Sequence, residues 1–154
     1  MQEYEQTGVL SEDILDLPSE EQLRKGVAIV ECVQEIPCNP CVDACPVDAI
    51  TMKDVNAPPH VDYAACIGCG QCVAVCPGLA CFVVKIENDH ALVTLPYEML
   101  PLPEEGDTVA ALNRHGEHVG EATVRRVKQG DTPVITVQVA PEHAMQVRTI
   151  EVEP

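Results

Sequence analysis

The chain has 154 residues, with 9 basic and 25 acidic side chains and a formal net charge of −16 at pH 7. Nucleic-acid phosphates and anionic lipids repel so acidic a chain, so we expect no nucleic acid as a partner. The longest apolar runs are too short for membrane insertion, and the acidic first residues do not resemble a signal peptide. We therefore expect a cytoplasmic protein, in which its nine cysteines indicate metal ligands before disulfides.

Residues 1–25 are predicted to form an acidic N-terminal arm with two short helices. The first helix is expected to start at Ser11 and to end before Pro18. The second has a capping box formed by Ser19 and Gln22, and Gly26 provides its end. A partly ordered tail is the alternative for this segment.

Residues 26–85 contain all nine cysteines and are predicted to be one domain. Apolar and β-branched residues predict strands at 27–31, 49–52 and 80–85. The Asn56-Ala-Pro-Pro59 segment divides this domain into two halves.

Residues 86–154 lack cysteine and are predicted to form a small antiparallel β domain. Runs rich in Val, Thr and Ile, separated by Gly-containing turns, predict strands at 91–95, 108–112, 118–128 and 134–140. Pro141 is expected to begin a last helical turn that reaches Val147. The predicted fold class is therefore α+β.

The cysteines repeat with an offset of 31 residues. The second half of the 26–85 domain has the motif Cys66-x2-Cys69-x2-Cys72-x3-Cys76-Pro77. Subtracting 31 from the last three cysteine positions and the proline gives Cys38, Cys41, Cys45 and Pro46. This motif is typical of the bacterial dicluster ferredoxin module, in which the fourth cysteine of each run binds the other cluster. We therefore expect two [4Fe-4S] clusters and a pseudo-twofold repeat.

The first motif departs from this pattern, because position 35 is Glu and the nearest upstream thiol is Cys32. Our interpretation is that Cys32 supplies the missing ligand across a longer loop. The alternative is that Cys32 is a buried strand residue and that its cluster has three irons or is labile. The predicted ligands are Cys32, Cys38, Cys41 and Cys76 for cluster A, and Cys66, Cys69, Cys72 and Cys45 for cluster B.

Other residues near the motifs have smaller predicted roles. Gly68 and Gly70 allow the backbone to approach cluster B and to donate N–H groups to its sulfurs, whereas prolines occupy several positions near cluster A. Because Pro37 and Pro40 cannot donate and the acidic Glu35 and Asp43 lie close by in sequence, we expect cluster A to have the lower reduction potential. Cys81 corresponds to Ile50 in the repeat and is predicted to be a small buried residue without a ligand role. A four-thiolate zinc site at Cys38, Cys41, Cys66 and Cys69 is the alternative metal centre, but it leaves the remaining repeated cysteines unexplained.

The sequence contains no phosphate-binding loop, dinucleotide fingerprint or nucleophile–base pair. We therefore expect no catalytic residues and no enzymatic activity for this chain on its own.

Three segments together resemble a known family: ECVQEIPCNPCVDACPVDAI, CIGCGQCVAVCPGLACFVV and LPYEMLPLPEEGD. They are similar to the small iron–sulfur subunits of flavin-dependent amino-acid dehydrogenases of the proline, hydroxyproline and sarcosine type. The resemblance implies a hetero-oligomer with flavoprotein dehydrogenase subunits, FAD or FMN on those partners, and electron relay to an acceptor. A free soluble 2[4Fe-4S] ferredoxin and a non-redox structural or regulatory iron–sulfur module are the alternatives.

Overall fold

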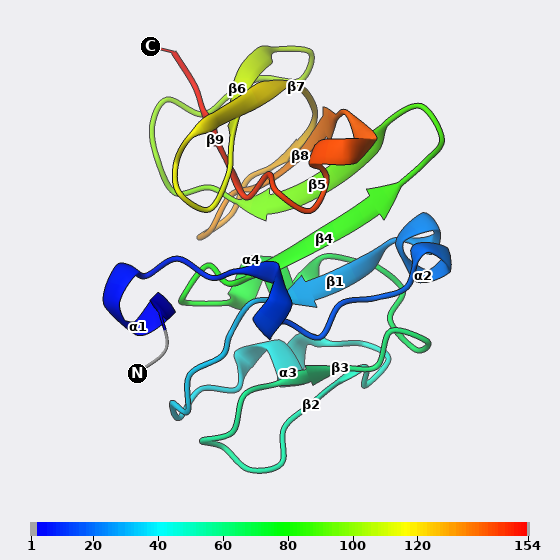
Figure 1. The fold of residues 1–154 in the computed structure, drawn as a ribbon, viewed down its shortest axis with the longest axis vertical. Helices are drawn as coiled ribbons and strands as arrows, with labels where there is room; N and C mark the ends of the chain where they lie inside the picture. Colours follow the sequence, from blue (N-terminus) through cyan, green and yellow to red (C-terminus); the bar gives the residue numbers. More distant parts are fainter. Residues whose placement is uncertain (1–2, 154) are drawn as a thin grey trace.

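The computed structural model describes residues 3–153, so the first two residues of the expected arm lie outside the described part. Seven strands form one antiparallel sheet in the order β1-β4-β5-β8-β7-β6-β9, and β2 pairs with β3 in a separate sheet. Figure 1 shows the C-terminal strands curled at one end of the molecule and the cysteine-containing segment at the other. Helices and a large antiparallel sheet together give the α+β class.

The helices are α1 (Glu3–Thr7), η1 (Glu12–Ile14), α2 (Glu20–Lys25), α3 (Pro40–Ala44), α4 (Gln71–Val75) and η2 (Pro141–His143). The strands are β1 (Val27–Val30), β2 (Ile50–Thr51), β3 (His60–Val61), β4 (Cys81–Ile86), β5 (Ala91–Pro96), β6 (Thr108–Leu112), β7 (His118–Lys128), β8 (Val134–Val139) and β9 (Thr149–Glu151). We did not predict α1, α3, α4, β3 or β9 from the sequence. These elements have two to five residues, which is too short for an apolar period to be recognised.

The predicted helix ends in the N-terminal arm are confirmed. The Ser19 hydroxyl accepts a hydrogen bond from the Gln22 N–H at 3.2 Å, and the Gln22 side chain accepts one from the Ser19 N–H at 2.9 Å. Gly26 follows α2 with a φ of 92°, a conformation that L side chains rarely adopt. The arm is anchored to the cysteine-containing segment, because the Tyr63 hydroxyl donates to the Asp16 carbonyl oxygen.

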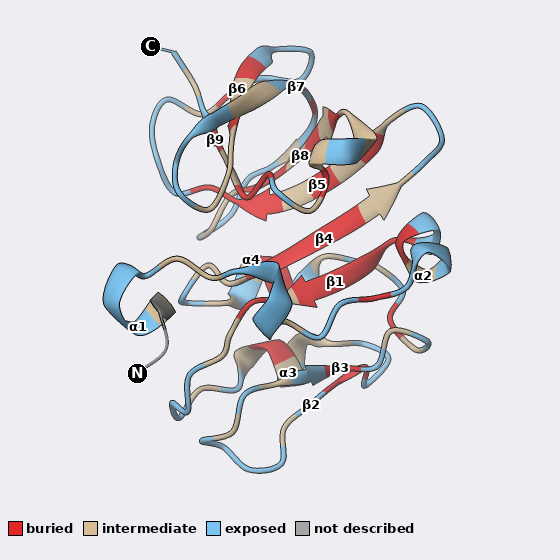
Figure 2. Cartoon of the chain, in the orientation of Figure 1, coloured by how far each residue is buried: buried red, intermediate tan, exposed pale blue. Residues whose placement is uncertain are grey.

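The β1–β4 pair lies at the centre of the molecule. The register places Ile29 opposite Phe82 and Val30 opposite Cys81. Both strands are almost wholly buried (Figure 2), with Val27 and Val84 at 0% exposure. Burial of these apolar side chains supplies a core in a chain that has few aromatic residues.

The C-terminal strands continue this sheet. β4 pairs with β5, and β5 pairs with β8 over six residues, so the strands after position 86 share hydrogen bonds with the strand that follows the cysteine motifs. β9 closes the other edge of the sheet by pairing with β6. The segment that we predicted as a separate β domain is therefore joined to β1 and β4 by continuous strand pairing.

The 31-residue offset of the motifs recurs in local structure. Adding 31 to the bounds of α3 gives the bounds of α4. Cys45 and Cys76 end these helices with nearly identical backbone angles, φ −71° and ψ 116° against φ −70° and ψ 115°. Asp48 and Leu79, again 31 apart, share the same positive φ of 54°. The two motifs therefore fold in the same local conformation.

Replacing Leu95 with Ala is expected to destabilise the protein by about 2–5 kcal/mol, because Leu95 is fully buried on β5 and its removal leaves a cavity in the shared sheet. Leu100 is 86% exposed, so Leu100→Ala is the matched control and should stay within about 0.5 kcal/mol of the parent. Denaturant unfolding measures both. Equal effects of the two substitutions would contradict the placement of the core.

Candidate metal centre

Three of the predicted ligands lie around a fourth, Cys32, which follows the end of β1. Burial raises the pKa of the Cys32 thiol, and the neighbouring charges of Cys76, Cys38 and Cys41 raise it further. Cys38 precedes α3, Cys41 lies within it, and Cys76 ends α4. The fold thus brings one thiol of the second motif to three thiols of the first, and we call this set group A.

The other four predicted ligands line one small apolar cavity. Its walls contain Cys45, Cys66, Cys69 and Cys72, together with small and aliphatic residues that include Ala28 and Gly70. Cys66 and Cys72 are buried, whereas Cys69 is exposed. This set, group B, combines one thiol of the first motif with three of the second.

Cys81 lies between the two groups. The residue is 1% exposed at the start of β4, and its side chain lies next to the thiols of Cys41, Cys72 and Cys76. These contacts raise the pKa of Cys81 and lower the pKa of Cys76 to about 5. Burial of Cys81 agrees with the sequence expectation, whereas its contact with three thiols from both groups was not predicted.

Backbone N–H groups point at cysteine sulfurs in both groups. The Ala80 N–H donates to Cys76 Sγ at 3.3 Å, and the Ala49 N–H, 31 residues earlier, donates to Cys45 Sγ at 3.2 Å. In group B the Ala28 N–H donates to Cys66 Sγ at 3.3 Å. Such bonds favour thiolates, which are the form of cysteine that binds iron.

Gly68 and Gly70, the two predicted tuning residues, both have positive φ, of 68° and 80°. A Cβ on Gly68 would lie 2.7 Å from the Gly26 carbonyl oxygen, closer than real Cβ contacts come. The loop between Cys66 and Cys69 is therefore packed directly on the backbone that enters β1. Gly70 is the N-cap of α4, the helix that contains Cys72.

A buried ionic cluster next to group A was not predicted from the sequence. Glu31 accepts hydrogen bonds from Arg114 Nε at 2.7 Å and Nη2 at 2.8 Å, and from Arg148 Nε at 2.6 Å. Burial raises the pKa of Glu31, but the two guanidinium groups outweigh it and leave that pKa below its usual value. Arg114 and Arg148 follow Glu31 in the sequence by 83 and 117 positions, respectively. No local sequence pattern could therefore reveal this cluster.

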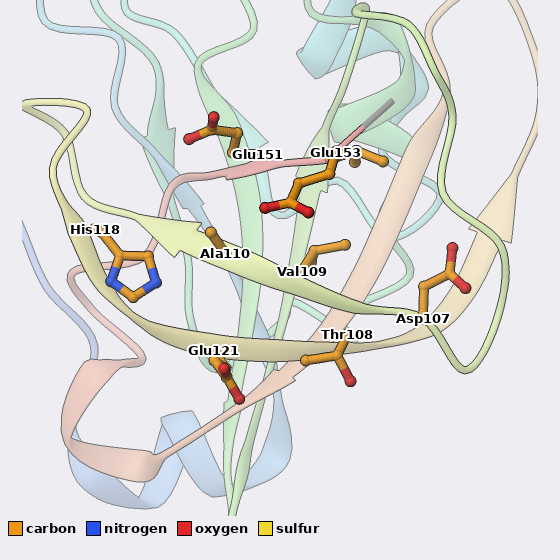
Figure 3. A pocket seen from close by; sticks show the side chains of 9 residues that line it. Asp107, Thr108, Val109, Ala110, His118, Glu121, Glu151 and Glu153 are labelled. Carbon is orange, nitrogen blue, oxygen red and sulfur yellow. The ribbon is translucent and has the colours of Figure 1, made fainter.

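A cavity of about 560 Å³ lies in the C-terminal region, away from the cysteines. Figure 3 shows carboxylates around it, including Glu121, Glu151 and Glu153, together with His118.

Within residues 3–153, no group of three His, Cys, Asp or Glu side chains could hold a single metal ion. In the same range, no helix has both the length and the apolar character needed to cross a membrane. All nine cysteines are free thiols.

The model of the 4Fe-4S dicluster domain family matches residues 31–80. Residues 31–80 form a ferredoxin-like iron–sulfur domain. The donor set suits [4Fe-4S] clusters, because eight thiols lie in two groups of four with N–H donors aimed at three of the sulfurs. Groups A and B are the two sets of four thiols that the sequence predicts as cluster ligands.

Three curated proteins are similar to parts of the chain. The polyferredoxin-like subunit of the aliphatic sulfonate oxidoreductase of Pyrococcus furiosus is 35% identical over 57 residues, which are 37% of this chain and 33% of that protein. An uncharacterized ferredoxin of Methanocaldococcus jannaschii is 38% identical over 68 residues, 44% of each chain. The thiosulfate reductase electron transfer subunit PhsB of Salmonella typhi is 50% identical over 38 residues, 25% of this chain and 19% of that one.

The matched region spans less than half the length of each of these curated relatives. The search of solved structures gave no match. The family match lies at residues 31–80, and each similarity to a curated protein covers less than half of this chain.

Gly68→Ala is expected to lower the melting temperature of the cluster-loaded protein and its retained iron. The positive φ alone costs about 1–2 kcal/mol for an L side chain, and the contact with the Gly26 carbonyl oxygen adds to this. Gly130→Ala is the control, because Gly130 has no positive φ in the range that excludes L residues and only an ordinary contact at 3.9 Å. A Gly68→Ala protein that loads and melts like the parent would contradict the close packing of this loop.

Proposed function

We propose that the chain is a non-catalytic electron-transfer subunit that holds two [4Fe-4S] clusters, cluster A on group A and cluster B on group B. Held by these thiolates, each cluster would supply one-electron redox chemistry, so the two together would match a two-electron donor on a partner.

The single observation that carries this proposal is the exchange of one cysteine between the motifs. Cys76 lies with three thiols of the first motif, and Cys45 lies with three thiols of the second. This exchange is what a pseudo-twofold dicluster module requires, since the fourth cysteine of each motif binds the cluster of the other. The matching conformations at Cys45 and Cys76 also support the pseudo-twofold relation.

The comparisons support membership in a larger redox complex. Two of the similar proteins are described as subunits, one as the polyferredoxin-like subunit of an aliphatic sulfonate oxidoreductase and one as the electron transfer subunit of thiosulfate reductase. For this chain we infer a hetero-oligomer in the cytoplasm with flavoprotein subunits of an amino-acid dehydrogenase. That finer inference rests on the resemblance of the three sequence segments named above.

Two exposed apolar regions support contacts with other subunits. Beside group B, Ile67 is 55% exposed and Val47 is 39% exposed, next to the exposed Cys69. Met99 and Leu100 are 58% and 86% exposed in the segment between β5 and β6, which contributes to the family resemblance. Electron transfer requires close approach of a partner to a cluster, and an apolar edge beside cluster B suits such an approach.

Cluster content is tested by chemical analysis of the protein purified without oxygen. We expect eight irons and eight acid-labile sulfides per chain. Cys81→Ala should leave both numbers unchanged, because Cys81 lies between the groups without a ligand role, whereas Cys32→Ala should lower the iron content. Four irons in the parent chain, or stoichiometric zinc, would contradict the proposal.

The complex is tested by isolating the tagged chain from its native host under anaerobic conditions. We expect flavoprotein subunits in fixed stoichiometry, and we expect proline, hydroxyproline or sarcosine to bleach the iron–sulfur absorbance through the flavin. If the chain is isolated alone as a monomer with reducible clusters, it is a free ferredoxin instead. If its clusters do not reduce reversibly, the structural alternative holds.

A further inference from the structure

Glu31, Arg114 and Arg148, which we call the Glu31 cluster, form a buried group with an excess of positive charge. Their side chains are only 6%, 12% and 5% exposed. Two guanidinium groups face one carboxylate, so the group has a net charge of +1 if all three are ionised. The second terminal nitrogen of Arg148, Nη2, is buried without a hydrogen-bond partner among the described residues.

The surroundings of Arg148 fix its charge in place. Its Nη1 donates to the carbonyl oxygens of Ala144 at 3.1 Å and Val147 at 2.6 Å, and its guanidinium carbon lies 5.1 Å from the centre of the Phe82 ring. The carboxylate of Glu12, in the N-terminal arm, also attracts the Arg148 guanidinium group. Glu12 is exposed, so water and salt screen this attraction.

Two short routes connect the Glu31 cluster to the ligands of cluster A. Glu31 is the residue directly before Cys32. Its N–H donates to the Ala80 carbonyl oxygen at 2.7 Å, and the Ala80 N–H donates to Cys76 Sγ at 3.3 Å. The backbone of Glu31 is therefore linked to two thiols of group A, directly to Cys32 along the chain and to Cys76 through Ala80.

The internal repeat provides a built-in comparison at cluster B. Adding 31 to Glu31 gives Asp62, whose N–H donates to the Ala49 carbonyl oxygen, also at 2.7 Å, and the Ala49 N–H donates to Cys45 Sγ. Asp62 is exposed, and among residues 3–153 no salt bridge to it is present. Lys25 donates to the nearby Ala64 carbonyl oxygen at 3.0 Å from an exposed position, where its charge is screened.

We propose that the Glu31 cluster raises the reduction potential of cluster A above that of cluster B. This inference rests on the proposed function. A cluster with four thiolates becomes more negative by one charge when it accepts an electron, so a nearby buried positive charge stabilises its reduced form. A buried full charge acts more strongly than the amide dipoles that the sequence led us to expect from Gly68 and Gly70. The order is therefore the reverse of the one expected from the sequence alone.

The test is an anaerobic redox titration with dithionite, in which dithionite is oxidised to sulfite and each cluster gains one electron, followed by electron paramagnetic resonance. The signal of cluster A is identified by its change in Cys38→Ser. Arg148→Gln removes one buried positive charge and should make cluster A at least tenfold harder to reduce, about 59 mV for one electron. Glu31→Gln removes the negative charge and should raise the reduction potential of cluster A. Arg148→Lys keeps the positive charge and should have the same reduction potential of cluster A as the parent protein.

Matched controls separate charge from structural damage. The exposed Arg125 lies on β7, and Arg125→Gln should leave both potentials unchanged. Asp62→Asn is the repeat counterpart of Glu31→Gln and should raise the reduction potential of cluster B alone. The increase should be smaller than that of cluster A in Glu31→Gln, because Asp62 is exposed. Arg114→Gln should lower the potential of cluster A in the same way as Arg148→Gln, so it replaces that variant if Arg148→Gln does not load eight irons.

Three results would overturn the inference. The first is a reduction potential of cluster A below that of cluster B in the parent protein. The others are potential shifts of the same sign in Arg148→Gln and Glu31→Gln, or no potential shift of cluster A in Arg148→Gln that carries all eight irons. Failure of the proposed function is recognised separately, because it appears as fewer than eight irons in the parent chain before any variant is titrated.

Discussion

The pairing of β1 with β4 is the constraint on which the rest of the structure depends. β1 precedes the first cysteine motif and β4 follows the second, so their antiparallel register brings the two ends of the 31–80 segment together. Cys32 thereby lies near Cys76, and Cys81 comes to lie between the two groups of thiols. Each group of four thiols contains residues from both motifs. The β1–β4 pair brings the two motifs close enough together to form these groups.

The same strands connect the metal centre to the C-terminal region. One edge of β4 pairs with β1 and the other with β5, from which the sheet continues to β9. Arg114 and Arg148, contributed by the C-terminal region, reach Glu31 at the end of β1. Removing one partner from a buried ion pair leaves an uncompensated charge and is strongly destabilising. The C-terminal region therefore contributes buried charge beside Glu31, the residue before the group A thiol Cys32.

The sequence predicted those features that depend on local chemistry. The strands at 91–95, 108–112 and 118–128 were placed within one residue of β5, β6 and β7, because β-branched runs between Gly-containing turns leave a clear pattern. The capping box at Ser19 and the 31-residue offset were recognisable for the same reason. The offset extends further than the cysteines do, since Asp48 and Leu79 adopt the same unusual backbone conformation without being the same residue type.

What the sequence did not reveal depends on contacts between distant positions. Glu31 is an ordinary acidic residue until Arg114 and Arg148 are placed beside it, and Cys81 is an ordinary apolar strand residue until three thiols surround it. The short helices α3 and α4 follow from the geometry of the cysteine loops and have no amphipathic period of their own. We placed a domain boundary between residues 85 and 86 because the composition changes there. β4 nevertheless includes both positions, and its sheet continues into the C-terminal strands.

If two clusters lie side by side around Cys81 with ligands exchanged between the motifs, their unpaired spins interact when both are reduced. Electron paramagnetic resonance of the fully reduced chain should therefore give a spectrum that integrates to two unpaired spins per chain and shows magnetic interaction between them. Cys76→Ser should perturb the cluster bound by the first motif. A spectrum of a single spin, or of two spins without interaction, would contradict this arrangement.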